Sequence, residues 1–273
     1  TSGLAANTVR ADAVGLPGSI MKADTNNFAP RFGFAWRPFN SNRTVLRGGY
    51  GIFYGSSSLY RMDEYSDTYP FSINETYSAV AGNPNAVTVS NAFPAARRSI
   101  GGTTSTYGGP SNPQSQYLQT YSFTVEREVG KGTVIDIGFS GSKGTHLQRR
   151  YDLNQPGREQ ALRGTRPYPG FATISIIADS SNSIYNSGAI TLRRRMSRSM
   201  FVRAAYTYAK SIDESSNTGG TIQYNFPGAQ DSRNLKSERG RSDFDIGHSF
   251  AGSFVWSPAF RRNPILKGWQ IAG

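Results

Sequence analysis

The 273-residue chain is polar for its length, with 37% hydrophobic residues and a mean hydropathy of −0.49, and it is rich in glycine (30), tyrosine (15) and phenylalanine (16). Lysine and arginine (30) outnumber aspartate and glutamate (18), but they are spread along the chain, so the net charge of +12 does not by itself identify a nucleic-acid site. The lack of cysteine excludes disulfides, thiolate metal sites and cysteine nucleophiles within the chain.

The composition favours strands, turns and long loops over helices. No apolar run approaches the roughly 20 residues of a transmembrane helix, and the start, TSGLAANTVRADAV, lacks the charged-then-apolar layout of a signal peptide. We therefore expect an all-β fold, in which any membrane-spanning role would come through a β-barrel.

The first predicted hairpin comprises residues 31–37 (RFGFAWR) and 44–54 (TVLRGGYGIFY), joined by a short polar turn. Two further hairpins follow. Apolar and polar residues alternate within 119–127 and within 133–140, which a tight turn separates, and they alternate again on both sides of a polar break within 186–210. Period-two alternation of this kind is typical of antiparallel strands. A last predicted strand, DFDIGHSFAGSFVW, spans 243–256, and its partner begins at 268–271.

Three long polar stretches separate these hairpins, at residues 55–118, 141–185 and 211–242, and the second includes an apolar segment at 171–178 that we interpret as a short strand. Short and long connections therefore alternate. A soluble sandwich has no physical reason to sort its connections in this way. An outer-membrane barrel does, because its short turns lie on the periplasmic side and its long loops lie outside.

Aromatic residues near the ends of the predicted strands suit the girdles of a membrane barrel, although they also occur in soluble β-cores. These residues are Trp36, Tyr54, Tyr206, Tyr208 and Trp256.

Four segments in series carry a resemblance to a known family: NFAPRFGFAWRPF with TVLRGGYGIFYG, then QTYSFTVEREVGKGTVIDIGFSGSKGTHL, then YNSGAITLRRRMSRSMFVRAAYTYAKSIDESS, and finally QDSRNLKSERGRSDFDIGHSFAGSFVW. They resemble TonB-dependent receptors of the outer membrane, specifically the barrel of the Oar-like group. Such a resemblance implies a barrel of about 22 strands, plugged by an N-terminal domain and energised through TonB.

The chain supplies too few strands for such a barrel, and no plug, TonB box or closing aromatic strand is recognisable in it. We therefore expect residues 1–273 to be a fragment of the barrel domain, a large transmembrane β-barrel of antiparallel strands with long external loops. Open strand edges are not tolerated in lipid, so further strands would pair with it. TonB would contact a part of the protein outside this chain.

Neither histidine is predicted to bind a metal, because His248 falls in an alternating strand, His146 lies beside a loop, and neither has a ligand spacing such as HExxH. The glycine spacing of residues 141–145 (GSKGT) does not fit a phosphate loop, and we interpret them as the start of a loop. The three arginines at 193–195 lie near a short turn. We interpret them as wall and turn charges rather than as a site for lipid phosphate or nucleic acid.

Three carboxylate pairs stand out: Asp63 with Glu64, Asp213 with Glu214, and Asp243 with Asp245. The first two are interpreted as solvated loop charges, because adjacent residues in a strand point to opposite faces and none lies with a nucleophile or base. The third pair shares one face. It would either bind a cation or pair with an arginine in the barrel lumen, and we favour the ion pair.

The leading hypothesis is an outer-membrane receptor or transporter barrel for TonB-energised uptake, with lipid and an external ligand of unknown identity as partners. The three long stretches would contact that ligand. We expect no catalysed reaction, no metal or cofactor, and no nucleic-acid partner. The alternatives are a secreted structural or adhesive β-protein that assembles through strand edges and, third, a basic nucleic-acid-binding β-domain. Only a lipid-facing wall requires detergent, which separates the first hypothesis from the other two.

Overall fold

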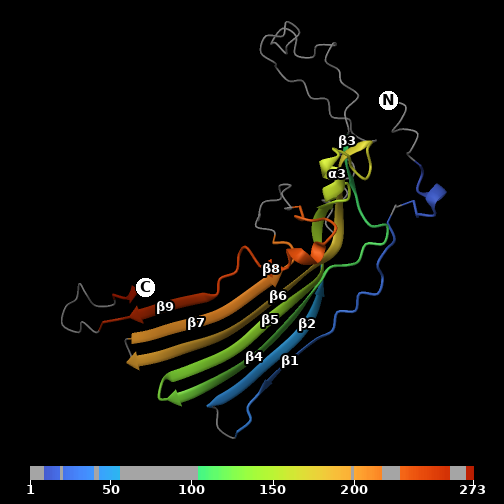
Figure 1. The fold of residues 1–273 in the computed structure, drawn as a ribbon. Coiled ribbons are helices and arrows are strands. Elements are labelled where there is room, and N and C mark those ends of the chain that lie inside the picture. Colours follow the sequence, from blue (N-terminus) through green and yellow to red (C-terminus); the bar gives the residue numbers. More distant parts are fainter. Residues whose placement is uncertain are drawn as a thin grey trace, which may run out of the picture.

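The structure, a computed structural model, describes residues 9–18, 21–39, 43–55, 104–197, 200–216, 228–258 and 269–273. In these ranges eight strands pair in sequence order, and every pairing along this path is antiparallel. They are β1 (Arg31–Trp36), β2 (Thr44–Tyr54), β4 (Tyr117–Gly130), β5 (Thr133–Asp152), β6 (Phe171–Ser197), β7 (Met200–Asp213), β9 (His248–Trp256) and β10 (Ile271–Ala272). Figure 1 shows them as one continuous, twisted wall.

Two short strands lie off this path. β3 (Thr104–Gly108) belongs to the connection between β2 and β4 but pairs in parallel with the start of β6, and β8 (Gly240–Arg241) pairs with the end of β7. The helical elements are brief: η1 (Asp12–Val14), α3 (Arg158–Leu162) and η3 (Leu235–Glu238). No helix of the described ranges has the length and hydropathy needed to cross a membrane. The prediction of an all-β, antiparallel fold is confirmed.

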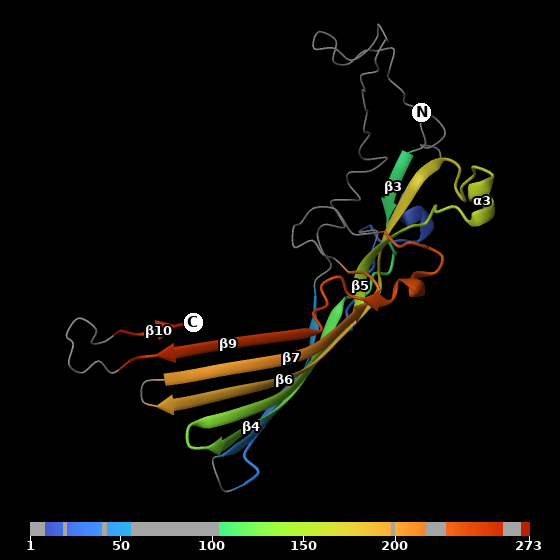
Figure 2. The ribbon, with the colours of Figure 1, turned by 60° about the vertical axis from the view of Figure 1, so that its left-hand side comes forward.

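The described sheet is open. β1 and β10 form its two edges, and within the described ranges no pairing joins them. Figure 2 shows the same wall from a second direction, with the connections after β5 and β7 gathered beyond one end of the strands. This is the arrangement expected of a section of a barrel wall.

From β1 to β9, short and long connections lie at opposite ends of the sheet, as predicted (Figure 1). At one end, which we call the turn end, β4 joins β5 through Lys131 and Gly132, and the glycine adopts the left-handed conformation with φ of 74°. At the other, which we call the loop end, lie the connections that follow β2, β5 and β7. β3, α3 and η3 all belong to these longer connections.

The prediction of a long loop over residues 141–185 is wrong. β5 continues to Asp152 and β6 begins at Phe171, so the connection between them is confined to residues 153–170. The segment 141–145, predicted to start a loop, is therefore part of a strand. The short strand predicted at 171–178 is confirmed as the beginning of β6.

β5 and β6 extend beyond the part of the sheet in which apolar and polar side chains alternate. Their backbone hydrogen bonding continues there although the alternation has ended. The β5–β6 register shifts between Gly144 and Leu147, and the ladder then resumes as far as Asp152. His146, inside this irregularity, has φ of 55° and is the one residue other than glycine with positive φ in the described ranges. A backbone ladder of this kind leaves no period-two signal in the sequence.

The wall has almost no interior of its own. Among the described residues the buried hydrophobic side chains are Ile177 and Ala209, whereas large apolar side chains such as Phe32 (67% exposed) and Phe250 (73% exposed) are uncovered. A single sheet without a second layer leaves one face unprotected from solvent. Apolar exposure on this scale indicates that another apolar medium covers that face.

Candidate functional site

Strand alternation gives the wall two chemically different faces. On one of them, apolar residues of neighbouring strands lie directly opposite each other: Leu46 and Val125, Phe123 and Phe139, Ile137 and Ile190, and Tyr206 and Phe250. We call this the apolar face. It runs across β1 to β9 without a charged residue among these pairs, and it is the surface that requires an apolar neighbour.

Aromatic residues border the apolar face at both ends. Toward the turn end, Trp36 lies opposite Leu46, eight positions (46 to 54) from Tyr54 at the loop end. Trp256 likewise lies opposite the first residue of β7, eight positions (200 to 208) from Tyr208. Residues 46–54 and 200–208 are nine residues each, which matches the roughly 9–11 residues with which a tilted strand crosses a membrane. The aromatic residues at the two borders are placed as the girdles that flank the apolar band of an outer-membrane barrel.

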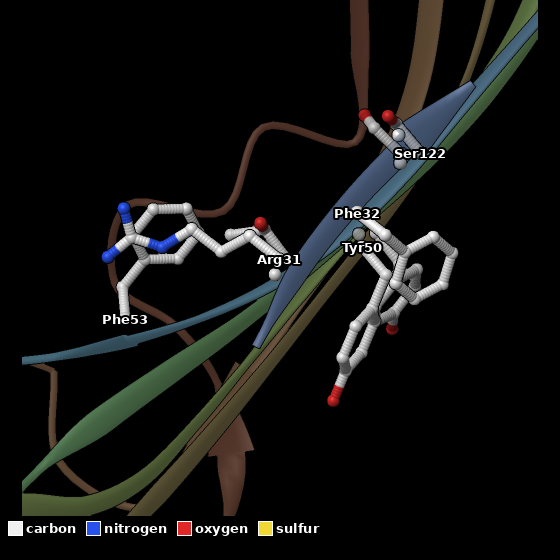
Figure 3. A pocket seen from close by; sticks show the side chains of 12 residues that line it. Arg31, Phe32, Tyr50, Phe53 and Ser122 are labelled. Carbon is white, nitrogen blue, oxygen red and sulfur yellow. The ribbon is translucent and has the colours of Figure 1, made fainter. Parts of the chain in front are cut away.

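The opposite face, which we call the polar face, carries small, hydroxyl-bearing and charged side chains. Figure 3 shows the division on the first two strands, where Arg31 and Phe53 project to one side of the ribbon and Phe32 and Tyr50 to the other. The guanidinium carbon of Arg31 lies 4.3 Å from the centre of the Phe53 ring, so a cation–π contact covers this aromatic on the polar face.

A shallow hollow of about 530 Å³ crosses β1, β2, β4 and β5 at this position (Figure 3). On the polar face Arg31 and Phe53 lie at one side of the hollow, and the rest of its lining there consists of glycines and short hydroxyl side chains: Gly33, Gly49, Gly51, Thr120, Ser122 and Ser140. Because these other side chains are small, the backbone of the wall can be approached closely beside the Arg31–Phe53 pair. We call this part of the polar face the trough.

Charged residues of the polar face are paired nearer the turn end. Arg193 donates from Nε and Nη2 to the two carboxylate oxygens of Asp136, at 3.1 and 3.0 Å, and from Nη2 to Oε2 of Glu126 at 3.0 Å. The same Glu126 oxygen accepts from Nη1 of Arg47, also at 3.0 Å. The cluster joins four strands, β2, β4, β5 and β6, and Arg193 is a wall charge, as predicted.

We expect Arg193→Lys to lower the unfolding free energy modestly, by about 1 kcal/mol or less, because lysine keeps the charge but loses the two-pronged contact, and partly exposed pairs are screened by water. The measurement is heat-induced unfolding of the full-length parent protein in detergent micelles, at low and high salt. The difference from wild type should shrink at high salt.

Arg194→Lys is the matched control, since position 194 projects from the other face of the same strand and Arg194 makes no contact in this cluster. Equal losses in both variants, or a loss in Arg193→Lys that salt does not alter, would show that the forked pairing contributes nothing specific.

At the loop end, Asn154 organises the connection between β5 and β6. Its side chain is completely buried, and Nδ2 donates to the carbonyl oxygens of Tyr168 (3.1 Å), Phe171 (2.8 Å) and Ala172 (3.2 Å). Its Oδ1 accepts from the N–H of Tyr168 at 2.8 Å. One side chain thus uses both its donor and its acceptor capacity to close residues 153–170 into a fixed loop.

Arg149 of β5 holds two points of the connection that follows β7. It is 2% exposed and donates to the carbonyl oxygens of Glu214 and Leu235, both at 3.2 Å. The Glu214 carboxylate in turn accepts from the backbone and side chain of Asn182, and the buried Asp213 accepts from a serine hydroxyl. The prediction that Asp213 and Glu214 are solvated loop charges is therefore wrong, because Asp213 is buried with Ser216 as its hydrogen-bond partner and Glu214 is hydrogen-bonded to Asn182 of β6.

Asp245 pairs with an arginine, but not with one on the barrel wall. Its Oδ2 accepts from Nε of Arg241 (2.8 Å) and its Oδ1 from the N–H of Ser211 (2.7 Å). The hydrogen bond from Arg241, and then the one from Ser211, lower the pKa of Asp245. These contacts hold residues 243–247 as a turn against β7, so the last long strand begins at His248 rather than at 243. Asp63 and Glu64 lie outside the described residues.

The two histidines lie apart. His248 is on the apolar face at its loop-end border, with Nδ1 2.8 Å from the hydroxyl of Tyr206, while His146 lies in the irregular part of β5 beside Tyr117. In the described part of the chain, no three His, Asp or Glu side chains gather in a way that would hold a metal ion.

Sequence reasoning missed the roles of Asn154 and Arg149 at the loop end. The sequence did contain a signal for Asn154, because residues 152–157 (DLNQPG) have the composition of a turn. It contained none for Arg149, because the carbonyl groups that accept its hydrogen bonds lie more than 60 positions away in the chain. Also unforeseen was a second cavity, of about 430 Å³, at the loop end between residues 23–27 and the start of β4.

One protein family matches nearly the whole chain. The model of a family described as an outer membrane beta barrel domain matches residues 2–273. Among solved structures, the outer membrane transporter YddB from Escherichia coli is similar, with 12% sequence identity and a TM-score of 0.48, over 86% of this chain and 35% of that chain. The chain thus spans about a third of the length of that protein. None of the curated proteins matches it.

Proposed function

The chain belongs to the outer membrane beta barrel domain family, and from this premise we propose that it forms part of the wall of a transporter that takes up an external ligand with energy delivered through TonB. The protein is located in the outer membrane, where its apolar face contacts lipid. No catalysed reaction is part of the proposal.

The observation that carries the proposal is the two-faced wall. Phe123 of β4 and Phe139 of β5 face lipid. On the other face of the same strands, the carboxylates of Glu126 and Asp136 accept hydrogen bonds from Arg193 of the neighbouring strand β6. Charged groups in a membrane wall are stable where they face water or protein rather than lipid. The polar face with its trough therefore lines the interior of the barrel, which is the route for a transported ligand.

The loop end carries the proposed receptor function. In barrels of this type the long connections lie outside the cell and the short turns lie on the periplasmic side. Buried Asn154 and Arg149 hold these connections in fixed positions rather than leaving them as free chain. TonB dependence is supported by the resemblance of four segments to Oar-like receptors, and TonB would contact a part of the protein outside this chain.

The location and sidedness are tested by treating intact cells that express the full-length parent gene with protease, and then separating their membranes. We expect outer-membrane protein that is cut in the long connections and resistant at the β4–β5 turn. Soluble or secreted protein would contradict the barrel and favour assembly through strand edges.

TonB dependence is tested separately, by crosslinking in the same cells between the parent protein and TonB, with and without an intact energised inner membrane. We expect a crosslinked product that depends on the parent protein's own periplasmic segment. An outer-membrane protein that gives no such product would remain a barrel but would not be a TonB-dependent receptor.

A further inference from the structure

The second cavity lies at the loop end of β2, β4 and β5 and has a volume of about 430 Å³. It is enclosed by residues 23–27 of the segment before β1, residues 112–115 before β4, and the side chains of Tyr54, Tyr117 and His146. Its volume falls within the roughly 300–1,000 Å³ of small-molecule pockets. We propose that this cavity binds a saccharide.

Three rings form one wall of the cavity. The ring centres of Tyr54 and Tyr117 are 5.4 Å apart, and the ring of His146 meets that of Tyr117 edge-on with centres 5.7 Å apart. Tyr54 and Tyr117 lie directly opposite each other at the ends of β2 and β4. Such a ring surface offers an apolar platform with polar tips, which matches the C–H face and the hydroxyl edge of a sugar ring.

The wall opposite these rings is polar. Asp24 accepts from the N–H of Ser115 at 2.8 Å, and Asn27 Nδ2 donates to the Ser115 hydroxyl at 2.8 Å, so the two chain segments are fixed against each other. Asn112 and Gln114 also line the cavity. Carboxamides and a carboxylate supply closely spaced donors and acceptors, the pattern that neighbouring sugar hydroxyls require.

The charge of the cavity disfavours an anionic ligand. The chain carries a net charge of +12, yet among the described residues no lysine or arginine lines this cavity. Its one carboxylate, Asp24, is held ionised because hydrogen bonds from Ser115 lower its pKa. An anionic ligand such as a phosphate or an acidic chelate would meet this negative charge without a lysine or arginine among those residues to offset it. A neutral, hydroxyl-rich ligand meets no such penalty.

The backbone at His146 supplies an independent observation. Its φ of 55° places a non-glycine residue in the left-handed region, inside the register shift of β5. A strained residue of this kind persists where its surroundings hold it, and such residues concentrate at ligand sites. Here the strained residue is the one whose ring completes the aromatic wall.

The saccharide has two possible sources with the same chemistry. Tyr54 and Tyr117 continue the rows of the apolar face, so the cavity opens at the border of the outer leaflet, where the sugar headgroup of a glycolipid is within reach. A free saccharide from outside the cell would enter from the loop end. The proposal adds a ligand class to the transporter function. It rests on that function only if the ligand is a free saccharide, because a glycolipid headgroup can bind without being transported.

The test uses the full-length parent protein in detergent micelles, with maltose, cellobiose, lactose and chitobiose as soluble probes and lipopolysaccharide as the glycolipid probe. Saturation-transfer NMR measures the disaccharides, and titration with fluorescently labelled lipopolysaccharide measures the glycolipid. We expect binding of at least one probe, weakened about tenfold or more in Tyr117→Leu, and no comparable binding of glucose 6-phosphate.

Asn112→Ala is a second variant, at an exposed position where a folding defect is not expected, and it should weaken the same probe. Tyr168→Leu is the matched control, because Tyr168 is a half-exposed tyrosine on another connection. We expect this variant to bind the probe as wild type does. A disaccharide response identifies a free saccharide, and a response to lipopolysaccharide alone identifies the headgroup.

Binding of none of the probes, or binding that Tyr117→Leu and Asn112→Ala leave unchanged, would overturn the saccharide site. This result is distinguishable from failure of the proposed function, because binding in micelles needs no TonB. Saccharide binding without a TonB crosslink would contradict only the energised uptake, and a TonB crosslink without saccharide binding would contradict only the cavity's role.

Discussion

Phe123→Arg is expected to reduce the amount of folded protein in the outer membrane severalfold. Phe123 lies near the middle of β4 on the apolar face, opposite Phe139, and is 43% exposed to the surrounding lipid. A guanidinium near the bilayer midplane of a barrel costs about 2–4 kcal/mol. That cost is a large fraction of the net stability of most proteins. The measurement is the fraction of heat-modifiable, folded protein in isolated outer membranes.

Ser122→Arg is the matched control, one position away on the same strand. Ser122 faces the trough, where a hollow of about 530 Å³ leaves room for a long side chain in contact with water (Figure 3). We expect near-wild-type amounts of folded protein. If both substitutions lowered the folded fraction equally, or if Ser122→Arg were the more damaging, the assignment of the two faces would be wrong.

Asn154→Ala is expected to open the connection between β5 and β6 to protease while the barrel itself stays in the membrane. The substitution removes four hydrogen bonds and leaves the N–H of Tyr168 and three carbonyl oxygens without this partner at a buried position. Buried groups left unpaired cost about 1–3 kcal/mol each, less where water enters, so we expect a local loss of roughly 2–4 kcal/mol. Trypsin treatment of intact cells measures it, because Arg158, Arg163 and Arg166 lie in this connection.

Leu162→Ala is the control for that experiment. Leu162 lies in the same connection, at the end of α3, and is 76% exposed, so its loss should leave the cleavage rate unchanged. Cleavage of Asn154→Ala at the wild-type rate would mean that the loop is held by other contacts, such as the hydrogen bonds from Arg166 to Asp152 and to the Asn154 carbonyl.

The wall was predictable from the sequence wherever its two faces meet different media. Phe32, Phe34 and Trp36 alternate with small or basic residues because one side of β1 contacts an apolar environment and the other a polar one. The same contrast revealed β2, β4, the first half of β5 and β7. The same alternation constrains the register, since a slip by one residue would exchange the two faces.

The outer half of β5 and residues 179–185 of β6 were not predictable, because mostly polar side chains there give no apolar alternation. Beyond Gly144 the ladder is held by backbone pairing, and side chains such as Gln148 and Arg149 give no alternation against their neighbours. The cavity was missed for a related reason. It is assembled from segments far apart in the sequence, and no local spacing records their meeting.

The parallel pairing of β3 with β6 implies an order in which the molecule is assembled. β3 follows β2 in the chain, yet the edge it occupies belongs to a strand three steps further along the path, and the Arg150 guanidinium lies 4.7 Å from the Tyr107 ring where they meet. Thr104 and Phe171 are 67 positions apart (171 − 104), whereas the hairpins of the wall join neighbouring segments. Because contacts between distant segments carry a larger loop-closure cost, we expect this one to form after the hairpins, as a late step at the cell surface that a change in β3 would slow without hindering insertion.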